Sequence, residues 1–393
     1  MIGSLTVKSH PVPLHTYSQI RTMAITAFTE EHNTPSQLTQ KLRNRISAAG
    51  SIPFREFMAT ALYDPDGGYY AGDQQRVGKD GDFITSVSAG RCFGLILAHR
   101  LTRYWREIGS PESFHIIEPG AHDGALCEDI LVEIRDSCPD FYKAVRYNLI
   151  ETTERLRSAQ TTRLTPDHTG KFEIHTDLSA ISNTTGAIIS NELIDALPVD
   201  LIRWQNDSWH LLIVDLDAEG NFHFTPDSIP TENTELADFC TTLSHYPEGY
   251  TTEFNPELRA FAKSASKCLG KGLLITIDYG HHAEDYYHPD RKEGTLQTYH
   301  SHQKSDNPLA APGEIDITAH VDFTRLQTEA EAAGFQLLSL GTQASYLTHQ
   351  AKEWLLSIEQ QLTPETPTLL RQFQTLTHPA MLGTRFMVLE MEK

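Results

Sequence analysis

Paired cysteines and long apolar runs are absent from this sequence of 393 residues. Its five cysteines are odd in number and include no CxxC pair, which argues against a disulfide framework or a cysteine-based zinc site and indicates a reducing compartment. No apolar run approaches the roughly 18 to 20 residues that span a bilayer, and the start lacks the continuous apolar core of a signal peptide. We therefore expect an intracellular protein without a membrane span.

Basic residues are also scarce, since 32 Lys and Arg stand against 52 Asp and Glu and give a net charge of −20. This balance disfavours nucleic acid as the main partner and suits cationic ligands or basic peptide segments. The length and the 39% content of hydrophobic residues predict a globular protein with one main domain and some additions.

One stretch, residues 114–131 (FHIIEPGAHDGALCEDIL), predicts a strand, a tight turn and a helix. The apolar run ends on Glu118, the turn contains Gly120 and Gly124, and the following residues have apolar side chains at helical spacing. Such a turn offers unpaired backbone N–H groups and lets a ligand approach a chain that lacks Cβ atoms. The stretch therefore predicts a site for a nucleotide-like cofactor.

The residues of this turn narrow the choice of cofactor. The dinucleotide fingerprint GxGxxG fails because His122 and Ala125 stand where two glycines are needed, and no GK[ST] of a phosphate-binding loop follows Gly124. S-adenosylmethionine, which has no phosphate, fits what remains. Gly120 would pass close to its methionine part, and Glu151, at the end of the next predicted strand, would accept both ribose hydroxyls.

The rest of the chain predicts an α/β fold with a mainly parallel sheet. Further strands are expected to end on Asp177, near the adenine amino group, on Asn191 and Glu192, and on Asp278. Helices are expected over residues 36–50, 54–62, 93–109, 125–134, 152–164, 256–270 (closed by a glycine) and 321–335, and a last strand near the C-terminus. We predict an N-terminal helical or lid region (1–110) and a Rossmann-like domain (111–393), with insertions at about 201–226, an antiparallel hairpin, and at 280–320, a long polar loop.

Several stretches resemble, in the same order, the MidA-like methyltransferases over about residues 52 to 390. They are IPFREFMATALYDPDGGYY, GKDGDFITS followed by FG, EPGAHDGALCEDIL, ETTERLRSAQ, NELIDALPV, ITIDYG, GEIDITAHVDF and MLGTRFMVLE. This family includes the mitochondrial complex I assembly-factor protein arginine methyltransferases. The resemblance implies a Rossmann-like methyltransferase fold, S-adenosylmethionine as the methyl donor and symmetric dimethylation of protein arginine. The family usually has a glycine where this chain has His122, so we expect a reshaped cofactor loop or an extra hydrogen-bond donor there.

Methylation of arginine needs acids that face the sulfonium, because a guanidinium is a poor nucleophile that a carboxylate can orient. Our first candidate is Glu192, oriented by Asn191, with Asp195 one helical turn away and Asp278 as the second acid. The alternatives are a capping pair for Asn191 and Glu192, a first-turn acid that stabilises a helix dipole for Asp195, and a turn acid for Asp278.

The segment GDFITS supplies further cofactor candidates, Asp82 for the methionine ammonium and Thr85, although a plain turn and helix cap explains it too. His320 with Asp322 can act as a proton acceptor and its orienting group, or Asp322 can simply cap a helix. Five histidines in or beside the loop resemble a metal cluster by number, but their spacing fits no fixed geometry, so no metal is expected. The tyrosines Tyr69, Tyr70, Tyr279 and Tyr299 can wall a cationic substrate or serve in packing.

We therefore expect a methyltransferase that acts on an arginine of a protein partner, such as a respiratory-complex subunit during assembly. Its location would be the cytoplasm of a bacterium or the mitochondrial matrix of a eukaryote. The hairpin, with its exposed-looking Trp204 and Trp209, is either a surface for a homodimer or partner or an edge of the core. Two alternatives remain: a different methyl acceptor, and an assembly chaperone with a vestigial cofactor pocket, which would tolerate Ala at Glu192 and Asp278.

Overall fold

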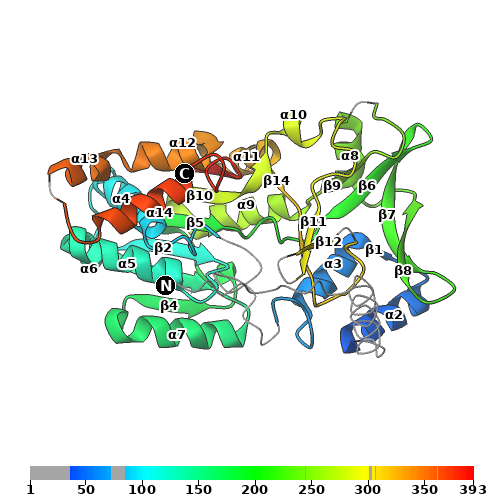
Figure 1. Ribbon diagram of the computed structural model, residues 1–393, viewed down its shortest axis with the longest axis horizontal. Coiled ribbons are helices and arrows are strands. Elements are labelled where there is room, and N and C mark those ends of the chain that lie inside the picture. The colour runs from blue at the N-terminus through cyan, green and yellow to red at the C-terminus, as the bar shows by residue number, and fades with distance from the viewer. Residues whose placement is uncertain (1–35, 72–84, 244, 301–302, 306, 361) are drawn as a thin grey trace, which may run out of the picture.

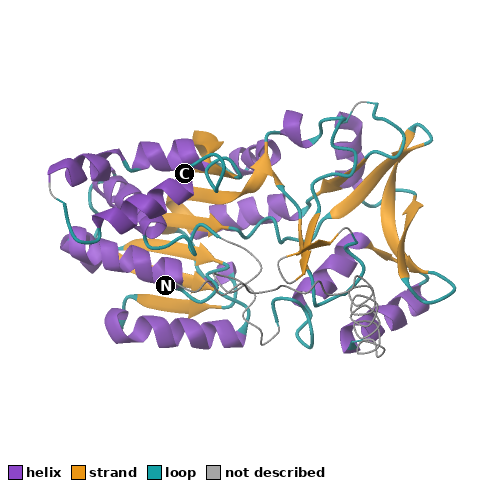
Figure 2. Cartoon of the chain, viewed as in Figure 1, coloured by secondary structure: helices purple, strands orange, loops and turns teal. Residues whose placement is uncertain are grey.

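The structure is a computed structural model that describes residues 36–71, 85–243, 245–300, 303–305, 307–360 and 362–393. Two lobes lie side by side, and the strands of the larger sheet point towards the smaller lobe (Figure 1). Figure 2 shows that strands form the middle layer of the larger lobe, with helices on both sides.

The larger lobe is built on one twisted sheet. In spatial order its strands are β15 (Gln336–Thr342), β16 (Phe386–Glu392), β10 (Leu269–His281), β5 (Thr184–Asn191), β2 (Phe114–Pro119), β3 (Val145–Ile150) and β4 (Phe172–His175), and β14 (Val321–Asp322) pairs with the end of β10. Strands β4, β3, β2, β5 and β10 are parallel, whereas β16 runs antiparallel between β10 and β15. Strand order reverses between β2 and β5, which is where open α/β sheets place their ligands.

Helices pack on both faces of this sheet, so the side chains on both faces of β5 and β10 are buried. This is why the sequences of these two strands are almost continuously apolar. One face packs against α4 (Cys92–Glu107), α5 (Ala125–Ser137), α6 (Pro139–Ala144), α7 (Glu154–His168), α12 (Gln343–Gln350), α13 (Lys352–Gln360) and α14 (Thr366–Thr377). The other face packs against α9 (Glu257–Cys268), α11 (Phe323–Ala332) and the short 3₁₀ helix η1 (Leu178–Ala180). Burial on both faces gives the Rossmann-like arrangement that the sequence predicted.

The smaller lobe joins segments that are far apart in the chain. Its five-stranded sheet contains β1 (Ile52–Pro53), β7 (Ser208–Leu216), β6 (Asp200–Gln205) and β9 (Thr251–Phe254) in that order, with β8 (Phe222–Asp227) also paired to β7. A three-stranded sheet has the order β12 (Gln303–Ser305), β11 (Gln297–His300), β13 (Asp316–Thr318), and the helices are α2 (Gln37–Ala49), α3 (Phe54–Tyr63), α8 (Thr234–Thr242) and α10 (Ala283–Tyr286). Helices α2 and α3, strand β7 and strand β13 share one apolar core.

Local sequence signals account for many of these boundaries. Ser36 caps α2 because its hydroxyl accepts the N–H of Thr39, and Gly50 ends the helix with a φ of 87°. Asp322 caps α11 in the same way by accepting the N–H of Arg325. The expected glycine cap of α9 is wrong, because the helix ends at Cys268 and Leu269 already begins β10.

The structure also revises the predicted insertions. The expected hairpin is part of a sheet that continues through β8 and β9, and the expected loop of residues 280–320 contains α10, β11, β12 and β13. Trp204 is only 8% exposed and packs against Trp209, so the two tryptophans lie at a core edge and do not form an open surface. No helix within the described residues is long and apolar enough to cross a membrane.

The predicted N-terminal region (residues 1–110) is divided between the two lobes in the structure. Helices α2 and α3 belong to the smaller lobe, whereas α4 packs on α5 within the main core. Strand β1 pairs with β7, so this region is not purely helical either.

Candidate active site

A cavity of about 1980 Å³ opens at the carboxyl ends of the parallel strands, between the two lobes. The predicted site residues that line it are Thr85, Glu118, Gly120, His122, Glu151, Asp177, Asn191, Glu192, Asp195 and His320. Gly124 and Asp278 are not among its lining residues, and Asp82 lies outside the described residues. Small-molecule pockets usually measure about 300 to 1,000 Å³, so this cavity has room for two occupants.

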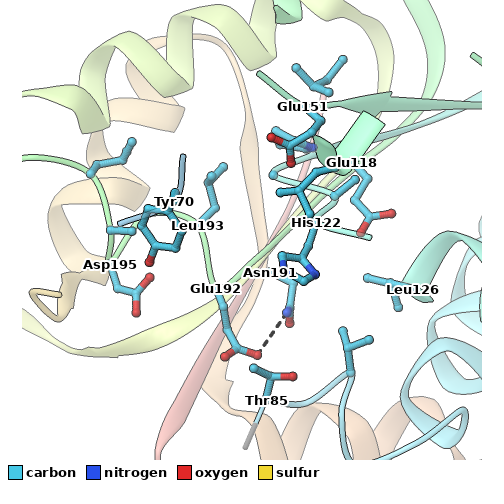
Figure 3. A pocket seen from close by; sticks show the side chains of 18 of the residues that line it. Tyr70, Thr85, Glu118, His122, Leu126, Glu151, Asn191, Glu192, Leu193 and Asp195 are labelled. Carbon is cyan, nitrogen blue, oxygen red and sulfur yellow. Dashed lines mark hydrogen bonds between the residues drawn. The ribbon is translucent and has the colours of Figure 1, made fainter. Parts of the chain in front are cut away.

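Three acids lie at or just beyond the carboxyl ends of neighbouring parallel strands at one end of the cavity. Glu118 lies within β2 and accepts a hydrogen bond of 2.6 Å from the hydroxyl of Tyr147, and burial raises its pKa to about 8. Glu151 follows β3, is 8% exposed and accepts the backbone N–H of Thr153 through Oε1. Asp177 is exposed beyond β4, and its hydrogen bonds to Ser179 lower its pKa. Figure 3 shows Glu118 and Glu151 on the same side of the cavity.

The turn between β2 and α5 depends on left-handed backbone. Gly120 has a φ of 72°, and a Cβ there would come within 2.8 Å of the Leu193 side chain. His122 has a φ of 46° in the same left-handed region, which is a physical reason for a glycine at this position. Its carbonyl accepts the side-chain amide of Gln160 at 2.7 Å, and the imidazole lines the cavity near Asn191 (Figure 3). Gly124 has a φ of 82° and precedes α5, so its role is in the turn.

Glu192 follows β5 and is held at the cavity wall by two hydrogen bonds. Its φ of 51° is left-handed, and its Oε1 accepts the backbone N–H of Ser86 at 3.1 Å and the amide of Asn191 at 3.2 Å (Figure 3). Burial, with the nearby charge of Asp195, raises the pKa of Glu192 to about 8. No hydrogen bond to its Oε2 comes from the residues that the structure describes, so this oxygen is available to a ligand.

The predicted helix after Glu192 does not form. Residues 192–199 are a turn, so Asp195 reaches the cavity through loop geometry and not from a helical face. Asp278 explains the turn: its Oδ2 accepts the N–H groups of Leu193, Ile194 and Asp195 at 3.2, 2.8 and 3.3 Å. The Asp278 side chain is fully buried, so a direct catalytic role predicted for it is wrong, and it positions the turn instead.

His320 lines the cavity, but its predicted partner is wrong. Asp322 caps α11 and accepts the hydroxyl of Tyr287 at 2.9 Å. His320 contacts His281 instead, with 3.1 Å between Nδ1 and Nε2, and its ring stacks on Tyr279. Among the described residues no group of three or more His, Cys, Asp or Glu side chains is placed to hold a metal ion.

The structure adds cavity residues that sequence reasoning missed. Asp316 lies in β13 and is 4% exposed, and Tyr63 stands at the end of α3. Asp123 is paired with Arg163 at 2.7 Å, which ties the glycine turn to α7. Both Asp316 and Tyr63 lie inside stretches that carry the family resemblance, GEIDITAHVDF and IPFREFMATALYDPDGGYY, which was a signal that could have found them.

The donor set fits S-adenosylmethionine on structural grounds. Gly120 permits a close approach where a Cβ would collide, and Glu151 presents a nearly buried carboxylate at the end of β3. The side-chain oxygen of Asn191 is buried without a hydrogen-bond partner among the described residues. An unsatisfied buried acceptor is costly, so a ligand N–H at this point would remove a penalty of about 1 to 3 kcal/mol.

Comparison with known proteins agrees with this geometry. The family model described as "Putative S-adenosyl-L-methionine-dependent methyltransferase" matches residues 96–341. The crystal structure of a protein from Burkholderia thailandensis bound to S-adenosyl-homocysteine is similar with a TM-score of 0.80 and 27% identity, covering 98% of this chain and 95% of that one.

Relatives with an assigned name are methyltransferases as well. The mitochondrial protein arginine methyltransferase NDUFAF7 homolog of Drosophila melanogaster is 27% identical over 90% of this chain and 84% of its own. The mitochondrial protein arginine methyltransferase NDUFAF7 of Homo sapiens is 24% identical over 90% of this chain and 83% of its own. With the family model matching more than half of its residues, the chain belongs to this family of S-adenosylmethionine-dependent methyltransferases.

Proposed function

We propose that this methyltransferase acts on an arginine side chain of a protein. The observation that carries the proposal is the second end of the cavity, where the carboxyl groups of Glu192, Asp195 and Asp316 gather, and where neither Glu192 nor Asp195 forms an ion pair with a described residue. Such a wall suits a positively charged acceptor. The names of the relatives as protein arginine methyltransferases support the same acceptor.

We assign the cofactor to the other end of the cavity. Glu151 would accept the ribose hydroxyls, Asp177 would lie near the adenine amino group, and Glu118, Asn191 and the turn at Gly120 would surround the methionine part. His122 would line the same end, and so would Thr85, which precedes α4 and is held to Ser88 by hydrogen bonds of 2.8 and 2.9 Å. When bound, S-adenosylmethionine supplies a methyl group on a positively charged sulfur.

The residues of the chain have to orient the guanidinium, because its lone pairs are delocalised. The free Oε2 of Glu192 would accept an N–H of the guanidinium, while Ser86 and Asn191 hold Oε1 in place. Because burial raises the pKa of Glu192 to about 8, arrival of a cation would favour the ionised form and strengthen the contact. Asp195 would accept a second N–H.

The methylated guanidinium loses one proton per turnover, and we assign its acceptance to His320. Its contact with His281 at 3.1 Å would hold the imidazole in position. The proton would reach solvent from this pair, since His281 is only half-buried.

The test is transfer from S-adenosylmethionine labelled in the methyl group to a set of peptides that differ only by an arginine or a lysine at one position. Mass spectrometry should find the label on the arginine. A Glu192→Gln variant, which keeps the shape and removes the charge, should lose roughly tenfold to a thousandfold in kcat/KM. Glu353→Gln on the exposed face of α13 is the matched control and should match the wild type. Label only on lysine or another group would contradict the proposal, and undiminished binding without any transfer would favour the chaperone alternative.

We also propose that the acceptor belongs to a respiratory complex in assembly, as the family resemblance implies, and that the protein works in the bacterial cytoplasm or the mitochondrial matrix. Light scattering after size-exclusion chromatography would test whether the protein also forms a homodimer. Affinity capture with a catalytically impaired Glu192→Gln variant, followed by methylation of the captured protein with the wild type, would identify the acceptor.

A further inference from the structure

We infer that the smaller lobe supplies the acceptor-binding wall of the cavity, in which the paired rings of Tyr63 and Tyr70 and the carboxylates of Asp195 and Asp316 select a planar guanidinium over an ammonium group. This inference rests on the proposed function. It assigns the recognition of the acceptor to three residues of the smaller lobe together with Asp195 from the turn after β5.

The two tyrosine rings are fixed by both stacking and hydrogen bonds. Their centroids lie 5.5 Å apart with 22° between the planes. The hydroxyl of Tyr63 donates to the carbonyl of Ala196 at 2.7 Å, and that of Tyr70 donates to Oδ1 of Asp316 at 3.0 Å. Each contact crosses from the α3 region to another element of the cavity wall, so the two rings are held in place. Figure 3 shows Tyr70 beside Asp195.

Asp195 is the unusual member of this wall. Its residue is only 7% exposed, its side chain lines the cavity, and no side chain of the described residues donates a hydrogen bond to it. Backbone N–H groups of the turn are the donors that reach it, so a buried carboxyl group with no side-chain donor can still accept hydrogen bonds from a ligand. Asp316 lies nearby, is 4% exposed and is oriented by Tyr70.

The groups that face Asp195 are acids and tyrosines. Burial and the charges of Asp278 and Asp316 raise its pKa well above the usual range. The charge of Asp195 in turn reaches Glu192 and the hydroxyl groups of Tyr63 and Tyr70. The charges named as acting on Asp195 are therefore acidic, and a cationic ligand would favour its ionised form.

A guanidinium meets these demands better than an ammonium. It is planar, carries five N–H donors and stacks on aromatic faces, so it can lie along the tyrosine pair while it donates to two carboxylates. An ammonium has three donors on a compact, strongly hydrated centre and loses more on desolvation. The wall should therefore favour arginine over lysine.

The experiment measures binding without turnover. Calorimetry with S-adenosylhomocysteine present would compare N-acetyl-arginine methylamide with N-acetyl-lysine methylamide, on the wild type and on Tyr70→Phe, Tyr63→Ala and Asp316→Asn. Matched controls are Tyr246→Ala, from the stacked pair Tyr246 and Tyr250 outside the cavity, and Asp200→Asn, a buried acid outside the cavity.

We expect the arginine compound to bind more tightly than the lysine compound, and the cavity variants to weaken its binding roughly tenfold or more, as for loss of a hydrogen bond to a charged group. Repeating the titration in buffers of different ionisation enthalpy should show proton release on binding, reduced in Asp195→Asn. Control-like affinity in all cavity variants, with arginine still preferred, would overturn the inference while the proposed function stands. Failure of the wild type to methylate arginine in peptides would refute the proposed function instead.

Discussion

The buried carboxylate of Asp278 makes a sharp prediction, because the structure gives it a positioning role. Asp278→Ala removes the acceptor of four backbone N–H groups, three in the turn after β5 and that of Tyr279 at 2.9 Å. Asp278→Asn keeps one oxygen for the three N–H groups of the turn but sets an amide N–H₂ against the N–H of Tyr279.

The distances set the size of the effect. The two bonds near 2.8 and 2.9 Å are well formed, and hydrogen bonds to charged groups contribute about 1.5 to 3 kcal/mol each. The two bonds at 3.2 and 3.3 Å add less, and removal of a buried carboxylate offsets part of the loss. We expect Asp278→Ala to lower the free energy of unfolding by about 3 to 5 kcal/mol and Asp278→Asn by about 1 to 2 kcal/mol, out of a typical total of about 5 to 15.

Urea denaturation followed by circular dichroism measures both values, and calorimetry with S-adenosylhomocysteine reports the cofactor end separately. A folded Asp278→Asn variant should bind S-adenosylhomocysteine within a few fold of the wild type but lose turnover, because Asp195 is displaced with the turn. An Asp278→Ala variant as stable as the wild type would refute the assignment, and so would unchanged turnover in a variant with the expected loss of stability.

Three further predictions concern the cofactor end. Glu151→Ala should weaken binding of S-adenosylmethionine and S-adenosylhomocysteine roughly tenfold to a hundredfold in calorimetry, while NAD should bind to neither protein. Gly120→Ala should lose stability by about 1 to 2 kcal/mol in urea denaturation and also lose affinity for S-adenosylhomocysteine, because a left-handed φ of 72° and a contact of 2.8 Å with Leu193 both oppose a Cβ. Glu118 has a pKa raised to about 8, so it binds its proton more tightly in the folded than in the unfolded state. Its contribution to the free energy of unfolding should therefore fall as the pH rises from about 4.5 to about 8, by up to about 1.4 kcal/mol per pH unit. Tyr147→Phe removes a donor that favours the ionised form and should extend this fall above pH 8, measured by denaturation at several pH values, whereas a flat profile in both proteins would contradict the role of burial.

The cofactor end could be predicted closely from sequence because it is local. Residues 114–191 contain consecutive strands, turns and helices, so apolar periodicity placed Glu118, Gly120 and Glu151 at the correct edge of the sheet. The order of the parallel strands then brought these acids together. The prediction of this end needed only short-range sequence patterns and the rule that ligands bind where the strand order of an open α/β sheet reverses.

The acceptor end was predicted less well because it depends on tertiary contacts. The NELID stretch reads as the start of a helix, but three hydrogen bonds that Asp278 accepts hold the residues after Glu192 in a turn. Apolar periodicity gives no sign of the role of Asp316, because its place beside Tyr70 comes from the packing of β13 on α3. The HxD spacing at His320 and Asp322 was ambiguous in sequence, and the structure resolves it as a helix cap and a separate histidine pair.

The construction of the smaller lobe from distant segments also bears on how the protein folds. The partners Ile52 and Val214 lie in paired strands, and the hydrogen bond from Tyr70 to Asp316 joins residues 246 positions apart. Closing such long loops costs entropy before any contact is gained, so they form late and slowly compared with the consecutive strands of the cofactor end. During synthesis the strands of the cofactor end (residues 114–191) can assemble first. The acceptor-binding wall is completed only after Asp316 has been added to the chain.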